Sequence, residues 1–206
     1  MSSGKTWASL GALIAAVVAG VVAVEGGYVN DPNDAGGETN HGITVAVARE
    51  QGYTAPMQSM PVEKAREIYA NTYIKVPKLD GVLAQSPAVG TKLVDISVNA
   101  GQGRAVRWFQ QSLNDLSRGG RDFPAVTVDG AMGTRTLAAY TALEKRRGRV
   151  KACELTLKVL DGYQIAHYTE LAKGTANASF LVGWVDHRIG NVPLSRCAET
   201  VAEGAQ

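Results

Sequence analysis

The sequence has 206 residues, which is enough for one domain or two small ones with a substantial core. Hydrophobic residues make up 45% of it and charged residues 19%, and the net charge of +2 is too small to point to a nucleic-acid partner. The three histidines and two cysteines lack metal-ligand spacing, so the sequence predicts no metal site and no cofactor.

An apolar run without any charged side chain extends from Ala8 to Val24. As a helix it would be roughly 26 Å long, at the short end of a membrane span, and its many Ala and Gly residues favour insertion only weakly. A cleaved signal peptide, a permanent anchor and a buried core helix are three interpretations. We favour a fourth, in which the segment first enters the membrane and later packs into the fold. Lys5 before the run predicts a cytoplasmic N-terminus.

The remaining elements follow in chain order. The first helix, from near Trp7, is predicted to end at the Gly26-Gly27 pair, and the Asn, Asp, Gly and Pro residues of 28–44 favour turns and a short hairpin. Apolar spacing predicts helices at 45–51, 61–73, 86–99, 101–116, 134–143, 151–171 and 180–189, with a connector at 76–82, a loop at 118–124 and a turn at 129–133. The predicted fold is therefore mainly α, of the α+β lysozyme-like kind, a helical bundle with one small irregular β region after Glu25.

Carboxyl groups in contrasting surroundings follow the apolar run. Glu25 comes directly after valines, and an apolar wall would keep its carboxyl group protonated. Asp34 lies among Asn, Gly and Thr residues, which keep a carboxylate ionised. Hydrolysis of a glycosidic bond needs such a pair, one acid to protonate the leaving oxygen and one carboxylate to position water or stabilise the transition state. Capping acids in ordinary turns are the alternative reading of the same residues.

The stretch from Glu25 to Thr44, EGGYVNDPNDAGGETNHGIT, closely resembles the start of the catalytic domain of glycoside hydrolase family 108, which includes phage endolysins and bacterial muramidases. The resemblance implies that Glu25 is the catalytic acid. It also resembles phage-type lysozymes, in which an Asp follows nine positions after the Glu and a Thr six further on. Asp34 has that spacing, whereas Thr39 is one position short and Asn40 stands in the expected place, and Asp31 remains a rival for the second carboxylate.

This resemblance implies roles for the neighbouring polar residues. Thr39 and Asn40 are expected to supply hydrogen bonds, and Tyr28 and His41 are expected to contact sugar. The catalytic domain would span residues 21–107. The outcome at the sugar carbon, inversion or retention, depends on the separation of the two carboxyl groups, and the spacing along the chain favours inversion.

The second half resembles the peptidoglycan-binding module that is usual in this family, here residues 108–191, packed with the first half as one globular unit. The matching residues are Asp95-x-x-Val98-Asn99-x-Gly101, Ala105 to Gln110, Val128-Asp129-Gly130-x-x-Gly133-x-x-Thr136-Leu137 and Gly183-Trp184-x-x-x-Arg188. Trp108 and Trp184 suit either a core or a sugar-binding platform. Residues 7–24 resemble the signal-anchor-release segments of some endolysins.

The sequence therefore predicts a monomeric muramidase for host-cell lysis that cleaves the β-1,4 bond after N-acetylmuramic acid in peptidoglycan. It would be tethered to the inner membrane before release and active in the periplasm afterwards. A non-catalytic wall-binding protein and a membrane-perturbing protein are the alternatives. In an exported protein Cys153 and Cys197 could form a disulfide, although their spacing alone does not establish that they come within reach.

Overall fold

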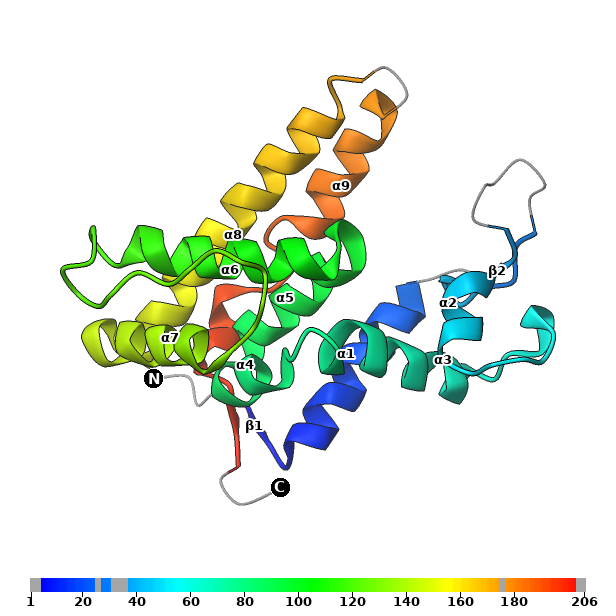
Figure 1. Ribbon diagram of the computed structural model, residues 1–206, viewed down its shortest axis with the longest axis horizontal. Helices are drawn as coiled ribbons and strands as arrows, with labels where there is room; N and C mark the ends of the chain where they lie inside the picture. The colour runs from blue at the N-terminus through cyan, green and yellow to red at the C-terminus, as the bar shows by residue number, and fades with distance from the viewer. Residues whose placement is uncertain (1–4, 25–26, 31–36, 175–176, 203–206) are drawn as a thin grey trace.

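The protein is mainly helical, as the sequence predicts (Figure 1). This computed structural model describes residues 5–24, 27–30, 37–174 and 177–202. The α-helices are α1 (Leu10–Val24), α2 (Val45–Glu50), α3 (Val62–Ala70), α4 (Asp80–Gln85), α5 (Pro87–Ala100), α6 (Gln102–Leu116), α7 (Thr134–Arg147), α8 (Arg149–Leu171) and α9 (Leu181–Arg188). Short 3-10 turns are η1 (Met57–Ser59), η3 (Ala178–Phe180) and η4 (Leu194–Ala198), and η2 (Asn71–Lys75) is a π-helical turn.

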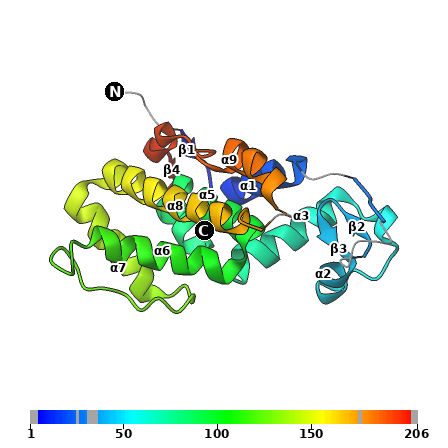
Figure 2. The ribbon, with the colours of Figure 1, turned by 90° about the horizontal axis from the view of Figure 1, so that it is seen from above.

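Two small sheets of two strands each complete the described fold. An antiparallel hairpin joins β2 (Thr39–Asn40) to β3 (Ile43–Thr44), with Thr39 opposite Thr44 and Asn40 opposite Ile43. A parallel pair joins β1 (Thr6–Trp7) to β4 (Thr200–Val201), close to the two ends of the chain. The hairpin lies with α2 at one end of the elongated molecule, and α6, α7 and α8 lie toward the other end (Figure 2).

Helix α5 is the centre of the core, because it packs against α1, α4, α6 and α8. Its buried residues point in several directions around the helix, as expected for an element that is covered on most sides. Gly90 permits the close approach of α4, since a Cβ atom at this position would lie 2.6 Å from the Leu83 backbone. Val89, Leu93 and Ile96, whose spacing in the sequence predicts a buried helix face, are indeed buried in the core.

Helix α1 is part of this globular core. Leu13, Val17, Val18 and Val22 are buried, and the helix packs against α3, α4 and α5. The small residues of its other side, Gly11, Ala12, Ala15, Ala16 and Gly20, are exposed. Among the described residues, no helix has both the length and the apolar character that crossing a membrane requires.

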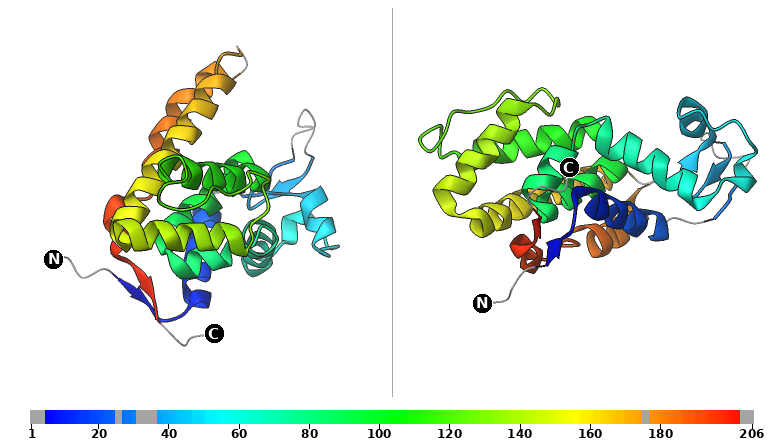
Figure 3. Two further views of the ribbon diagram at one scale, coloured as in Figure 1. Left: turned by 60° about the vertical axis from the view of Figure 1, so that its left-hand side comes forward. Right: turned by 90° about the horizontal axis from the view of Figure 1, so that it is seen from below.

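The segments near the two chain ends hold each other in place, and Figure 3 shows β1 and β4 side by side. The Thr200 N–H donates to the Lys5 carbonyl at 3.1 Å, and the Ala202 N–H donates to the Trp7 carbonyl at 2.9 Å. A disulfide between Cys153 in α8 and Cys197 in η4 fixes the segment that leads into β4. The pairing that the sequence left open is thus present.

The helices α4 and α8 differ from the sequence-based expectation. Residues 80–85 form α4 where a connector was predicted at 76–82, because the chain turns back into a helix after Lys78, which has a φ of 56°. Helix α8 begins at Arg149, and Gly148, with a φ of 81°, separates it from α7. The basic run at the end of α7 is held by the buried Asp122 carboxylate, which lies 2.6 Å from Arg147 and 3.3 Å from Arg146.

Candidate functional site

Four of the predicted site residues lie in one small β unit. The hairpin turn consists of His41 and Gly42, and both have positive φ, 50° and 73°, as a two-residue turn of this kind requires. Val29 forms an isolated bridge to Thr39, with hydrogen bonds of 2.8 and 2.9 Å between their backbones. The segment that carries Tyr28 therefore runs alongside the hairpin that carries Thr39, Asn40 and His41.

The side chains of this unit are directed mainly at the protein itself. Asn40 is buried, and its Nδ2 donates to the Met57 carbonyl at 2.6 Å, which ties the hairpin to η1. The His41 ring nitrogen Nε2 lies 3.3 Å from the Met60 carbonyl. Thr39 Oγ1 donates over a long 3.4 Å to the Gly37 carbonyl, and Tyr28 packs half-buried against the core. Among the contacts of Thr39, Asn40 and His41, the Thr39 hydrogen bond is the longest.

The predicted carboxylates lie outside the described residues. Glu25 directly follows the last residue of α1, and Asp31 and Asp34 belong to the stretch that leads to Gly37 and β2. The described structure therefore gives the two elements that flank these acids, the end of α1 and the start of the hairpin, and it gives no distance between the carboxyl groups.

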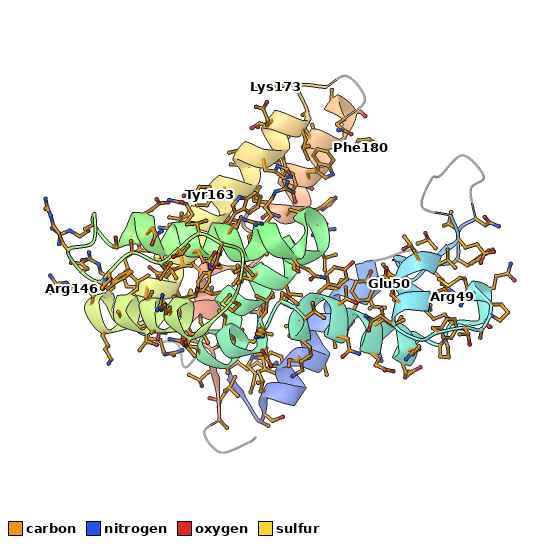
Figure 4. All side chains as sticks on the ribbon, in the orientation of Figure 1. Arg49, Glu50, Arg146, Tyr163, Lys173 and Phe180 are labelled. Carbon is orange, nitrogen blue, oxygen red and sulfur yellow. A yellow bond between two sulfur atoms is a disulfide. The ribbon has the colours of Figure 1, made fainter. Side chains whose placement is uncertain are left out.

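A groove of about 910 Å³ runs along α1 and is walled by α5 and α9. Gly20 and Val21 of α1 line it near the end of that helix, and Phe180 and Trp184 line the opposite wall. Figure 4 shows Phe180 at the start of α9, beside the upper part of α8. The volume falls in the range of about 300 to 1,000 Å³ that is usual for ligand sites.

Ion pairs give the groove a polar lining between its aromatic residues. Arg188 of α9 donates to Asp95 of α5 at 3.0 Å, and Arg196 donates to Glu199 at 2.8 Å. The indole N–H of Trp7 donates to the same Glu199 carboxylate at 3.0 Å. Burial alone would raise the pKa of Glu199, yet the hydrogen bonds from Arg196 and Trp7 bring this pKa below its ordinary value. Glu199 is thus held as a carboxylate.

Sequence reasoning found only part of this groove. The motifs Asp95-x-x-Val98-Asn99 and Trp184-x-x-x-Arg188 carried the resemblance, and the structure joins them through the Arg188–Asp95 ion pair. The sequence did not indicate that Lys5, Trp7, Arg196 and Glu199 belong to a site, because no local pattern shows that segments almost 200 residues apart meet. Within the described residues no group of three His, Cys, Asp or Glu side chains is arranged to hold a metal ion.

Comparisons with known proteins match both halves of the chain. Residues 18–101 match the family model described as Glycosyl hydrolase 108, and residues 104–189 match the one described as Predicted Peptidoglycan domain. The solved structure of Brucella abortus SagA is similar, with a TM-score of 0.61 and 26% sequence identity over 89% of this chain and 92% of that chain. No curated protein matches the chain.

These matches point to a class of protein, the glycoside hydrolases that act on peptidoglycan. Residues 18–101 are thus similar to a glycosyl hydrolase 108 domain, and residues 104–189 are similar to a peptidoglycan domain. The groove lies where the two meet: α1 and α5 contribute residues from the first match, and Phe180, Trp184 and Arg188 come from the second.

Proposed function

We propose that the protein is a muramidase, which hydrolyses the β-1,4 bond between N-acetylmuramic acid and N-acetylglucosamine in peptidoglycan. The observation that carries the proposal is the groove along α1. The groove is lined by residues of both the glycosyl hydrolase domain and the peptidoglycan-binding domain. Helix α1, which forms one of its walls, ends at Val24, the residue before Glu25.

Glu25 is the general acid of this proposal. It would protonate the oxygen of the leaving sugar, which requires a carboxyl group that keeps its proton near neutral pH. The support is the apolar character of the helix that it follows, in which Val18 and Val22 are buried in the core. Asp34, with Asp31 as the rival, would position water or stabilise the positive charge that develops on the sugar, and Thr39 would assist by hydrogen bonding.

The test of the acid is Glu25→Gln, which keeps the size of the side chain and removes its ability to give a proton. We expect new reducing ends from purified peptidoglycan to appear at least about 100-fold more slowly. The matched control is Glu50→Gln on the exposed end of α2, which should leave the rate unchanged. Comparing Asp34→Asn with Asp31→Asn then assigns the second carboxylate. A Glu25→Gln protein that cleaves at the parent rate would refute the assignment.

A non-catalytic wall-binding protein is the second candidate, favoured by the match to a peptidoglycan-binding domain alone. The two candidates differ in their products, because binding alone releases no reducing ends. Mass spectrometry of soluble fragments also fixes the bond that is cut: N-acetylmuramic acid at the reducing end indicates a muramidase, and N-acetylglucosamine there indicates a glucosaminidase.

We also propose that the segment 7–24 associates with the inner membrane before it packs as α1, and that the active enzyme works in the periplasm as a monomer during host lysis. The support is the sequence from Ala8 to Val24, which contains no charged side chain. Fractionation of cells before and after collapse of the membrane potential tests this step. Recovery of the protein in the soluble fraction under both conditions contradicts it. The muramidase proposal places the catalytic domain at residues 21–107 and the peptidoglycan-binding module at residues 108–191.

A further inference from the structure

The groove is lined by aromatic residues and by paired ions. Trp184 is half-buried, and its ring packs near that of Tyr168, with a centroid distance of 5.2 Å, and near that of Phe180, at 5.9 Å, which also lines the groove. These contacts fix the ring, and the same residue lines the groove. A fixed aromatic ring beside a cavity is a ready surface for stacking against a flat apolar face of a ligand.

Trp7 is a second tryptophan that lines the groove. Its indole N–H is held by Glu199, and its ring carries the Lys5 ammonium group 3.5 Å from the centroid. Neither Trp7 nor Glu199 falls in a family match, because the matched residues run from 18 to 101 and from 104 to 189. Segments outside both domains therefore complete the groove.

The charges of the groove decide which ligand it suits. Arg188 is paired with Asp95 and Arg196 with Glu199, so most of the charge is already neutralised within the protein. Such a surface gives little attraction to a polyanion, which needs several unpaired cations. Paired ions also present many hydrogen-bonding atoms, and together with aromatic rings these suit an uncharged ligand rich in hydroxyl and amide groups. The remaining cation, Lys5, suits an occasional carboxylate on that ligand.

We propose that this groove binds the glycan strand of peptidoglycan, with Trp184 as the stacking platform and Trp7, which is held by Glu199 and carries Lys5 over its ring, as part of the groove wall. The inference rests on the proposed function, since it takes peptidoglycan as the substrate, and it adds where the strand lies. The α1 wall comes from the hydrolase domain and the α9 wall from the peptidoglycan-binding domain, so one strand in this groove contacts both.

The first experiment measures binding of an oligomer of β-1,4-linked N-acetylglucosamine by calorimetry, with all variants made in the Glu25→Gln background so that the probe stays intact. We expect Trp184→Ala to weaken binding about tenfold or more and Trp7→Ala to weaken it several-fold. Trp108→Phe is the matched control, because Trp108 stacks on Tyr163 and His167 and is not among the groove residues. Equal affinity in all three variants overturns the proposal.

A second pair of variants does not disturb the aromatic packing. Ala15 and Ala16 are neighbours on α1 and both are exposed, but only Ala16 lines the groove. We expect Ala16→Phe to fill the groove and weaken binding about tenfold or more, and Ala15→Phe to bind like the parent. Thermal unfolding of each variant checks that it is folded. If Ala16→Phe binds the oligomer as tightly as Ala15→Phe does, the groove is not the glycan site.

The two proposals fail in different ways. Cleavage that persists in Glu25→Gln, together with loss of binding in Ala16→Phe, removes the catalytic assignment and keeps the glycan groove. Cleavage that stops in Glu25→Gln but continues at the parent rate when Ala16→Phe is placed in the otherwise unchanged protein removes the groove and keeps the muramidase.

Discussion

Lys92 is a single buried residue that connects three of the elements around the groove. Its side chain is 1% exposed, and its ammonium group lies 2.6 Å from the Asp161 carboxylate of α8. It also donates to the Arg188 carbonyl at 2.7 Å and to Asn191 Oδ1 at 3.0 Å. A buried cation is tolerated only with such partners. Lys92 therefore fixes the end of α9 against α5, beside the ion pair that lines the groove.

Gly90 carries a prediction at the same scale. In Gly90→Ala the new methyl group would meet the Leu83 backbone at 2.6 Å and its side chain at 2.7 Å, so α4 must shift. We expect the free energy of unfolding to fall by about 2 kcal/mol, as for other overpacked cores. Denaturant unfolding measures it.

Gly162→Ala on α8 is the matched control, since no atom lies within 4 Å of the new Cβ. There the gain in helix propensity should stabilise the protein by about 0.5 to 1 kcal/mol. Equal effects of the two substitutions would show that the tight approach of α4 and α5 carries no energetic weight.

Single residues also mark the limit of sequence reasoning at the site. Asn40 was expected to bind substrate because of its place six positions after Asp34. Its side chain donates to the Met57 carbonyl, and its role toward substrate stays a prediction. A sequence specifies that a residue can form hydrogen bonds, whereas its partner depends on which loop packs beside it. Glu25, Asp31 and Asp34 lie outside the described residues, so their roles stay predictions.

At the scale of elements, strong periodicity gave reliable predictions. The helices at 86–99 and 101–116 correspond to α5 and α6 almost residue for residue, because apolar positions and flanking Ser, Pro and Gly mark both ends. The six-residue α4 was missed, although α2, which has the same length, was predicted, because Gly81 inside α4 is unfavourable in a helix and typical of a connector. The two-residue strands β1 and β4 leave no pattern at all, and their pairing depends entirely on the tertiary fold.

The β1–β4 pair predicts a pH dependence through Glu199. Its folded pKa lies below the ordinary value of 4.5, so the carboxylate form stabilises the fold fully above pH 4.5. That contribution is lost as the pH falls through the lowered folded pKa, because the unfolded chain then binds the proton first. We expect the free energy of unfolding to drop more steeply below pH 4.5 in the parent than in Glu199→Gln.

Denaturant unfolding at several pH values between about 6 and 3 measures the difference between the two proteins, which removes the contribution of all other acids. Glu50→Gln on the exposed end of α2 provides the control, and it should follow the parent. Parallel curves for the parent and Glu199→Gln would mean that the Arg196 and Trp7 contacts do not stabilise the carboxylate.

The disulfide acts at the scale of the whole molecule. Cys153 and Cys197 enclose a separation of 44 residues, and closing a loop of this size stabilises a fold by about 4 kcal/mol. We expect that loss in the free energy of unfolding when the protein is reduced or when both cysteines are replaced by Ser. Because Cys197 lies just before β4, the amide protons of Thr200 and Ala202 should also exchange faster with solvent.

Hydrogen exchange in α6 provides the internal reference for that measurement. Its residues Phe109 and Leu113 are buried in a helix that carries neither cysteine, so their protection should fall only with global stability. If reduction accelerates exchange equally in α6 and at the β1–β4 pair, the disulfide stabilises the molecule as a whole and does not hold the end segments in particular.

The pairing of β1 with β4 also has a consequence for how the protein is made. Thr6 and Thr200 are 194 positions apart, so at about 5 to 20 residues per second their contact can form only roughly 10 to 40 s after the first of them is synthesised. During that interval β1 has no partner strand, whereas the helices α3, α4 and α5, against which α1 packs, have already been made. The helical core can therefore assemble first, and the small parallel sheet of β1 and β4 is added to it afterwards.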